Sequence, residues 1–248
     1  LATHKNLSVE VVPNLGSNLA YKSLQSGRID LYPEYTGNLL TGKDALNLTV
    51  PADKSAITAL VREQMERQHG MVLLELFGFN NTYALCLPRA LAELHNLEKI
   101  SDLVRVPELR AVVDLEFMDR PDGWKGLVET YGLRFHNPPQ QVSPDLLYRA
   151  LEAGSADLIC GFATDWQIDS LNLMVLHDDR GYFPNYHGAP LVRASVLKRD
   201  PTVAAVLNRL GGQIDDVTMR RLNAEVAKEK RTESEVVREF LVQKGLRQ

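Results

Sequence analysis

Two aromatic residues stand where an α/β protein is expected to bind a ligand. Tyr35, in "DLYPEYTGN", follows an apolar run that predicts a strand. "YKSLQSGRIDLYPEYTGN" from Tyr21 and "YRALEAGSADLICGFATD" from Tyr148 align without a gap, which puts Tyr35 opposite Phe162. Each segment predicts a helix, a glycine stop and a strand, with one aromatic residue just beyond the carboxyl end of the strand, where open α/β sheets bind ligands. The repeat indicates either a duplication or ordinary helix-glycine-strand architecture.

The sequence lacks the common motifs of catalysis. It contains no G-x-S-x-G elbow, phosphate-binding loop or H-E-x-x-H motif, and its six histidines are dispersed. Asp114 and Glu116 flank one predicted strand end, but alternate residues of a strand point to opposite faces, which disfavours acid-base catalysis by this pair. These observations favour a binding protein over an enzyme, with no cofactor or metal.

The composition is that of an ordinary globular protein. The 248 residues are 44% hydrophobic and 24% charged, which is enough for two lobes with separate cores. The net charge is −4 and positive residues are scattered apart from "KEKR" at 228–231, so nucleic-acid binding is not predicted. Cys86 and Cys160 lie in apolar runs, which predicts two buried free thiols. No apolar run reaches the roughly 18 to 20 residues that cross a bilayer.

Predicted strands and helices alternate along the chain, which argues for a mainly parallel α/β sheet. The amphipathic stretch 55–70 predicts a surface helix that a glycine ends. Three helical pieces are expected within 201–245, the last of them opened by the capping box "TESE" at 232–235. The predicted strands are 7–12, 28–32, 82–87, 109–115 and 156–162.

Five motifs occur along the chain in the order and approximate spacing of a known family. They are "SGRIDLYPEYTGN", "GFNNTYALCL", "EFMDRPDG", "ALEAGSADLICGFATD" and "YFPNYHGAPLVR". The chain resembles the substrate-binding proteins of ABC importers for osmoprotectants, the glycine betaine, choline and carnitine group. The resemblance runs from about Leu7 to the closing "VVREFLVQKGL", and the pairing of "YPEYTG" with "NNTYAL" is specific to that group.

The resemblance implies a two-lobed periplasmic-binding-protein fold of type II. Each lobe is then a mainly parallel sheet flanked by helices, and two crossover segments act as the hinge. Lobe one is expected to comprise residues 1–83 and 187–248, and lobe two residues 84–186. Such proteins close on their ligand like a hinged trap.

The implied ligand site is an aromatic cage between the lobes. A quaternary ammonium group is positive but has no N–H to donate, so the negative faces of aromatic rings can surround its methyl groups. By the resemblance, the cage consists of Tyr35, Tyr83, Phe162 and Tyr186. The family commonly has tyrosine at the third of these positions, so Phe162 keeps the ring and loses the hydroxyl.

Two further residues are expected to contact a ligand carboxylate. Arg120 in "EFMDRPDG" offers a planar, permanently charged fork that can form two parallel hydrogen bonds. Asn38 could add a donor, although many relatives have threonine there. The resemblance also predicts another polar contact from a "GSKNFTEQ"-like segment, which would stand before the first residue of this chain.

Structural roles compete with these assignments. Tyr35, beside Pro33, could pack a turn, and Tyr83 could pack the hinge. Arg120 could form a surface ion pair with Asp119 or Asp122, which would contribute little stability.

Phe162 could likewise be an ordinary core ring at a strand end. Tyr32, Trp124 and Trp166 are assigned to structure. Thr164 and Asp165 are expected to cap a helix that begins near Trp166.

The expected partners are a small quaternary ammonium ligand and the permease subunit of an ABC importer, with the binding protein itself a monomer. The expected location is the periplasm or another extracytoplasmic, membrane-associated position, as a free protein, a lipoprotein or a permease fusion. A ligand-sensing domain of a regulator, or a binding protein for a different cationic metabolite, is the alternative.

Overall fold

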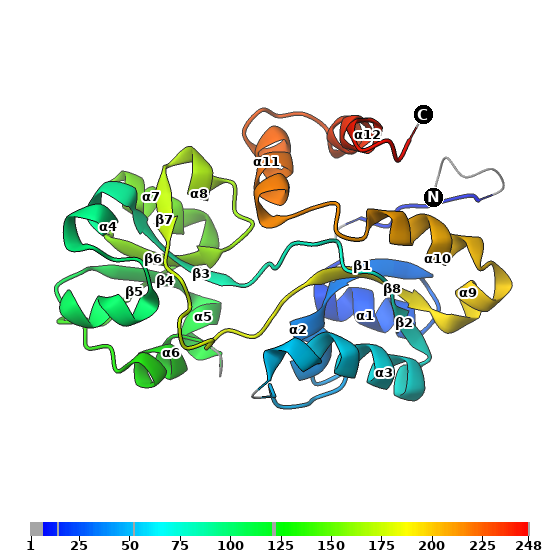
Figure 1. Ribbon diagram of the computed structural model, residues 1–248, viewed down its shortest axis with the longest axis horizontal. Coiled ribbons are helices and arrows are strands. Elements are labelled where there is room, and N and C mark those ends of the chain that lie inside the picture. The colour runs from blue at the N-terminus through cyan, green and yellow to red at the C-terminus, as the bar shows by residue number, and fades with distance from the viewer. Residues whose placement is uncertain (1–6, 14, 52, 121–122, 248) are drawn as a thin grey trace. The chain divides into compact units, whose positions relative to one another are not determined.

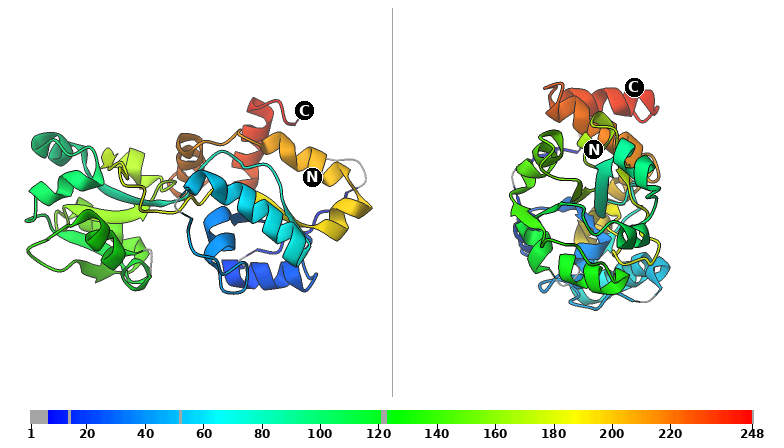
Figure 2. Two further views of the ribbon diagram at one scale, coloured as in Figure 1. Left: turned by 60° about the horizontal axis from the view of Figure 1, so that its bottom comes forward. Right: turned by 90° about the vertical axis from the view of Figure 1, so that its left-hand side faces the viewer.

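The computed structural model describes residues 7–13, 15–51, 53–120 and 123–247. It divides the chain into two units: unit 1 is Leu1–Asn81 with Asn185–Gln248, and unit 2 is Thr82–Pro184 (Figure 1, Figure 2). The chain passes between them twice, at 81/82 and at 184/185, rather than at the expected 83/84 and 186/187. Tyr83 therefore belongs to unit 2, and Tyr186 belongs to unit 1.

Unit 1 is built on an antiparallel sheet with the order β1-β8-β2. Its strands are β1 (Leu31–Tyr35), β2 (Met71–Leu73) and β8 (Gly188–Arg193), and β8 runs antiparallel to both neighbours. The expectation of a mainly parallel sheet is wrong here. After the chain returns to unit 1 at Asn185, it forms β8. This strand lies between β1 and β2, which precede it in the sequence and run in the opposite direction.

Helices cover both faces of the sheet of unit 1 (Figure 1). Leu191 and Leu73 pack with helices α1 to α3 on one face, whereas Val192 and Leu74 pack with α9 and α10 on the other. Alternation along a strand explains this division, because successive side chains point to opposite faces. The helical segments are α1 (Ser17–Gln25), α2 (Thr36–Thr41), η1 (Lys54–Ala56), α3 (Ile57–His69), α9 (Ala194–Arg199), α10 (Thr202–Leu207) and η4 (Asn208–Leu210).

Helix α3 confirms the helix predicted over 55–70. Ile57, Val61 and Met65 recur every four residues and are buried against the core of unit 1. Gly70 ends the helix in the left-handed conformation with φ of 62°, which glycine adopts without the steric cost of a Cβ.

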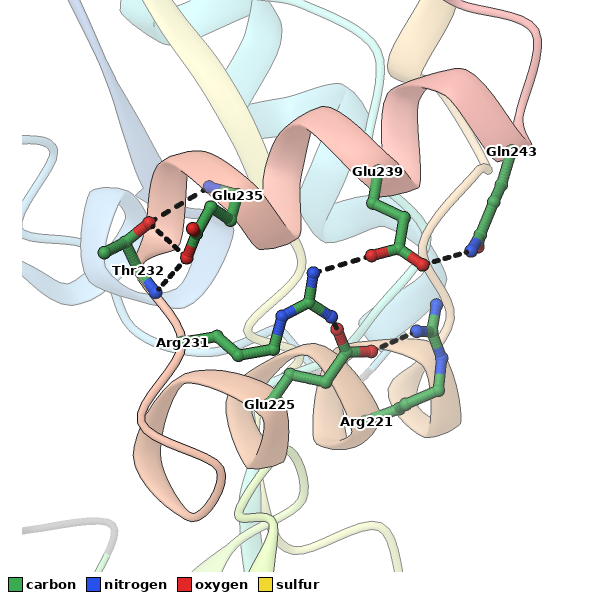
Figure 3. A network of polar contacts seen from close by, with 7 residues as sticks. All are labelled: Arg221, Glu225, Arg231, Thr232, Glu235, Glu239 and Gln243. Carbon is green, nitrogen blue, oxygen red and sulfur yellow. Dashed lines mark hydrogen bonds and ion pairs between the residues drawn. The ribbon is translucent and has the colours of Figure 1, made fainter.

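The C-terminal helices α11 (Asp216–Ala227) and α12 (Glu233–Gln243) are joined by charged side chains (Figure 3). Arg231 donates to Glu225 and to Glu239, each at 2.6 Å, and Arg221 also pairs with Glu225. The capping box predicted at 232–235 is confirmed: Thr232 and Glu235 exchange side-chain-to-backbone hydrogen bonds. Because one arginine bridges both helices, high salt should loosen their pairing.

The start of α11 is tied to the segment that leads out of unit 1. The Oδ1 atom of Asp216 accepts a hydrogen bond from the Asn80 backbone N–H at 2.7 Å. Two residues earlier, Ile214 forms a parallel bridge with Gly78. These contacts attach the C-terminal helices to the chain just before it enters unit 2.

Unit 2 is built on a mixed sheet with the order β5-β4-β6-β3-β7. Strand β4 is parallel to β5 and β6, whereas β3 is antiparallel to β6 and β7. The α/β class is confirmed, but this sheet too departs from the mainly parallel expectation. Its strands are β3 (Tyr83–Pro88), β4 (Ala111–Asp114), β5 (Gln140–Val142), β6 (Leu158–Phe162) and β7 (Leu173–Val175).

Two clusters of apolar side chains enclose the sheet of unit 2. Leu85 and Cys160 lie in one cluster with η2, α5 and α6, whereas Cys86 and Ile159 lie in the other with α7 and α8. The prediction of two buried free thiols is confirmed. The helical segments are α4 (Arg89–His95), η2 (Ile100–Arg105), α5 (Leu115–Asp119), α6 (Trp124–Tyr131), η3 (Pro144–Leu146), α7 (Leu147–Glu152) and α8 (Gln167–Ser170).

One predicted strand does not form. Residues 7–12 have no strand assignment, and Val9, Val11 and Val12 are exposed. Their β-rich composition favours a strand only where a neighbouring strand supplies pairing and packing. Within the described ranges, no helix is long and apolar enough to span a membrane.

Candidate ligand-binding site

The carboxyl end of β1 positions Tyr35. The strand ends at this residue and α2 begins at Thr36, so the extended backbone of Tyr35 is the N-cap of the helix. Its ring packs edge-on against Phe79 with the centroids 6.4 Å apart. Its hydroxyl accepts a hydrogen bond from the Asn81 side-chain amide at 3.4 Å, and burial raises the pKa of Tyr35. The phenol is therefore held at two points and stays neutral.

Asn81 links Tyr35 to Tyr186 within unit 1. While its side chain reaches Tyr35, its backbone N–H donates to the carbonyl of Tyr186 at 3.0 Å. The neighbouring Asn80 accepts from the Tyr186 N–H through its side-chain oxygen at 2.7 Å. Tyr35 and Tyr186, which are far apart in sequence, are thus both bonded to Asn81, and Tyr186 is bonded to Asn80 as well.

The ring of Tyr186 is buried, with 6% of the residue exposed, against the first turn of α2. A Cβ at Gly37 would lie 2.6 Å from two carbons of this ring. Glycine is therefore required at position 37 for the ring to keep its place.

Gly37→Ala is expected to displace the Tyr186 ring and to destabilise the protein by about 1 to 3 kcal/mol, the usual cost of overpacking. Chemical denaturation checks the stability, and calorimetric titration with a quaternary ammonium ligand should show weaker binding. Gly16→Ala is the control, because a Cβ there meets no atom within 4 Å. Equal effects of the two substitutions would contradict the steric argument.

A buried carboxyl group lies behind Tyr35. Glu34 is only 4% exposed, and its Oε1 accepts from the Tyr35 N–H at 2.7 Å and from the Asn38 side-chain amide at 3.1 Å. Its Oε2 accepts from the Tyr32 hydroxyl at 2.8 Å. Burial raises the pKa of Glu34, and these three donors partly offset the effect. One N–H of Asn38 is therefore engaged by Glu34, which leaves its other N–H for a ligand.

In unit 2, Tyr83 and Phe162 lie opposite each other on the paired strands β3 and β6. Their rings stack with centroids 5.1 Å apart. Phe117 and Phe183 also contact the Tyr83 ring, at 4.6 Å and 5.8 Å, and Tyr83 is 7% exposed. Tyr83 is thus a core ring of unit 2, on which the partly buried Phe162 stacks.

Arg120 lies next to this aromatic cluster. It follows α5 directly, and its guanidinium carbon is 5.8 Å from the centroid of the Tyr83 ring. It pairs with Glu116 at 3.2 Å rather than with Asp119, and Asp122 is outside the described residues. The side chain of Glu116 is 72% exposed, so this ion pair contributes little stability.

The pair considered for acid-base catalysis has structural contacts instead. The buried Asp114 caps α5 by accepting the Phe117 N–H at 2.8 Å, whereas Glu116 pairs with Arg120. One carboxylate is a helix cap and the other lies in solvent.

Asp165 was expected to cap the following helix, but its side chain has other partners. Its Oδ2 accepts from the Phe162 N–H at 2.9 Å and from the Tyr148 hydroxyl at 2.7 Å. Trp166 is the N-cap of α8, and its side chain forms no capping hydrogen bond. Burial raises the pKa of Asp165, and the two donors partly offset the effect. The carboxyl belongs to the end of β6 rather than to the start of α8.

Sequence reasoning missed four residues that hold the aromatic side chains. Asn80 and Asn81 stand in the quoted motif "GFNNTYALCL", and the adjacent amides were the available signal. Glu34 lies between two tyrosines, but a charged residue is rarely expected to be buried. Phe79 and the changed role of Asp165 follow only from the tertiary structure.

The fold defines the class of protein before any ligand is considered. Two α/β units joined by two chain crossings are the architecture of two-lobed periplasmic binding proteins. A solved structure described as a glycine betaine/carnitine/choline ABC transporter has a TM-score of 0.88 with this chain at 29% identity, covering 94% of this chain and 86% of that one.

The chain belongs to the OpuAC family, the substrate binding domain of the ABC-type glycine betaine transport system, which matches residues 1–243. It is 35% identical to a glycine-betaine-binding protein of Pseudomonas aeruginosa, over 96% of this chain and 79% of that protein. It is 33% identical to the carnitine transport binding protein OpuCC of Listeria monocytogenes, over 95% of this chain and 77% of that protein. These matches confirm the family resemblance.

Proposed function

We propose that this protein binds a small quaternary ammonium compound, such as glycine betaine, choline or carnitine, for import. The observation that carries the proposal is the grouping of aromatic side chains within each unit. In unit 1 both Tyr35 and Tyr186 are hydrogen-bonded to Asn81, and in unit 2 Phe162 stacks on Tyr83. Ring faces attract a cation that has no N–H to donate.

Arg120 extends the proposal to ligands that also have a carboxylate. Its guanidinium lies beside the Tyr83 ring, and Glu116, one of the groups with which it pairs, is largely exposed. A betaine carboxylate would gain a charge-assisted, bidentate pair in exchange for a weak surface contact. Asn38 would add its second N–H. The names of the two relatives, a glycine-betaine-binding and a carnitine transport binding protein, agree with this ligand class.

The proposed partner is the membrane permease of the same importer, and the proposed location is extracytoplasmic. Membership of a substrate-binding family supports both. We propose that the protein acts as a monomer whose two lobes are the units described here, with the shifted boundaries.

The test is isothermal titration calorimetry against glycine betaine, choline, carnitine, glycine and proline. The methylated cations are expected to bind saturably, and glycine and proline are not. Glycine and proline share the carboxylate but lack the quaternary nitrogen, so they separate cation recognition from carboxylate recognition. Binding of glycine or proline as tight as that of the betaines would overturn the proposed ligand class, and so would no binding by any methylated cation.

A further inference from the structure

The aligned segments of the two units place a carboxyl group differently in sequence but similarly in space. In that alignment Glu34 is opposite Gly161, and Asn38 is opposite Asp165. Unit 1 therefore has its carboxyl group at the position just before the aromatic residue, and unit 2 has it three residues after.

In both units the carboxyl group accepts the backbone N–H of the aromatic residue at the strand end. Glu34 accepts the Tyr35 N–H at 2.7 Å, and Asp165 accepts the Phe162 N–H at 2.9 Å. A tyrosine hydroxyl donates to each carboxyl group as well: Tyr32 donates to Glu34 at 2.8 Å, and Tyr148 to Asp165 at 2.7 Å.

In unit 2 the carboxyl group and its tyrosine partner leave no space for a side chain at position 161. A Cβ at Gly161 would lie 2.3 Å from the Tyr148 hydroxyl and 3.0 Å from the Asp165 Oδ2. Gly161 thus leaves room for the hydrogen bond between Tyr148 and Asp165. In unit 1 the aligned position is Glu34, which supplies the carboxyl group itself. A carboxyl group is retained behind each aromatic residue although a different chain position supplies it.

Helix capping or turn formation would not need a buried acid at these places. The N-cap residues of α2 and α8, Tyr35 and Trp166, form no side-chain capping hydrogen bond, and a neutral amide oxygen can accept two hydrogen bonds as a carboxylate oxygen does. Placing a carboxyl group where burial opposes its charge costs stability. That cost would be offset if a bound cation lay near the ring in front of it.

We propose that Glu34 and Asp165 are positioning residues that hold Tyr35 and Phe162 and supply the negative charge by which the aromatic residues of each unit select cations. The proposal rests on the proposed function, because it assumes that these rings contact a quaternary ammonium group. It adds a source of selectivity to the rings, whose faces also attract uncharged methyl groups.

The test compares choline with 3,3-dimethyl-1-butanol, its uncharged isostere, in the wild type, Glu34→Gln and Asp165→Asn. Choline affinity comes from calorimetric titration, and isostere affinity from competition against choline. Each substitution keeps the size of the side chain and removes its charge. Each is expected to weaken choline binding by about tenfold while isostere binding changes less than about twofold.

The ratio of the two affinities separates charge from folding. A purely structural role would weaken both ligands equally, and that result would overturn the proposal, as would unchanged choline affinity in both variants. Because the two carboxyl groups lie in different units, Asp165→Asn still tests the proposal if Glu34→Gln does not fold.

Asp102→Asn is the matched control. The Asp102 side chain is largely covered and accepts two backbone N–H groups, from Glu98 and Lys99, but no aromatic residue of the site. It is expected to leave the choline-to-isostere ratio unchanged. If the wild type bound no quaternary ammonium compound, the proposed function itself would fail; wild-type binding with an unchanged ratio in both variants would reject only the role of the two carboxyl groups.

Discussion

Arg120→Ala is expected to weaken glycine betaine binding by about 10- to 100-fold and choline binding by no more than about twofold. Hydrogen bonds to charged groups contribute about 1.5 to 3 kcal/mol, and only betaine has a carboxylate to receive them. Calorimetric titration of both ligands measures the difference. The Tyr83 ring also packs on Phe117, Phe162 and Phe183, so the loss of Arg120 is expected to leave it in place.

Two other substitutions test the same contact. Arg134→Ala removes an exposed arginine of unit 2 and should change neither affinity. Glu116→Gln removes the competing carboxylate and is expected to leave betaine affinity unchanged or higher. Equal losses of betaine and choline on Arg120→Ala would remove the assigned carboxylate role.

Tyr35→Ala is expected to weaken choline and betaine binding alike, by about 30-fold or more. A desolvated cation-π contact contributes about 2 kcal/mol, and its loss does not depend on the ligand carboxylate. The same titrations measure the effect. Tyr186→Ala should act in the same direction, but its ring also packs on Gly37, so it will lower stability as well.

Conservative replacements at position 35 distinguish the ring from its bulk. Tyr35→Phe keeps the aromatic face and loses only the 3.4 Å hydrogen bond from Asn81, so affinity should fall by about threefold at most. Tyr35→Leu keeps an apolar side chain without the ring quadrupole and should resemble the alanine variant. Near-normal cation binding by the leucine variant would exclude a cation-π role for Tyr35.

Short sequence patterns predicted those parts of the fold whose geometry depends on residues close together in the sequence. The spacing of Ile57, Val61 and Met65 and the stop at Gly70 predicted α3, and the pair Thr232 and Glu235 predicted the start of α12. Strand direction was not predictable in this way. It depends on which distant strands pair, as with β8 between β1 and β2, and local composition contains no information on that order.

The sequence located the candidate aromatic residues but not the groups that hold them. Tyr35 and Phe162 were singled out by the aligned repeat and the family resemblance, and the structure places both at strand ends. Glu34 was passed over because burial of a carboxyl group depends on donors that only the fold supplies, here Tyr32 and Asn38. Their ligand roles stay predictions until the variants are measured.

The attachment of helix α11 makes Val217 a suitable position for a reporter dye. Asp216 accepts the backbone N–H of Asn80, whose side chain in turn accepts the backbone N–H of Tyr186. Val217 is 61% exposed, so a fluorophore on a cysteine introduced there would meet solvent rather than the core, while both native thiols are buried. An optical sensor for osmoprotectants could then be built without altering any aromatic residue of the site.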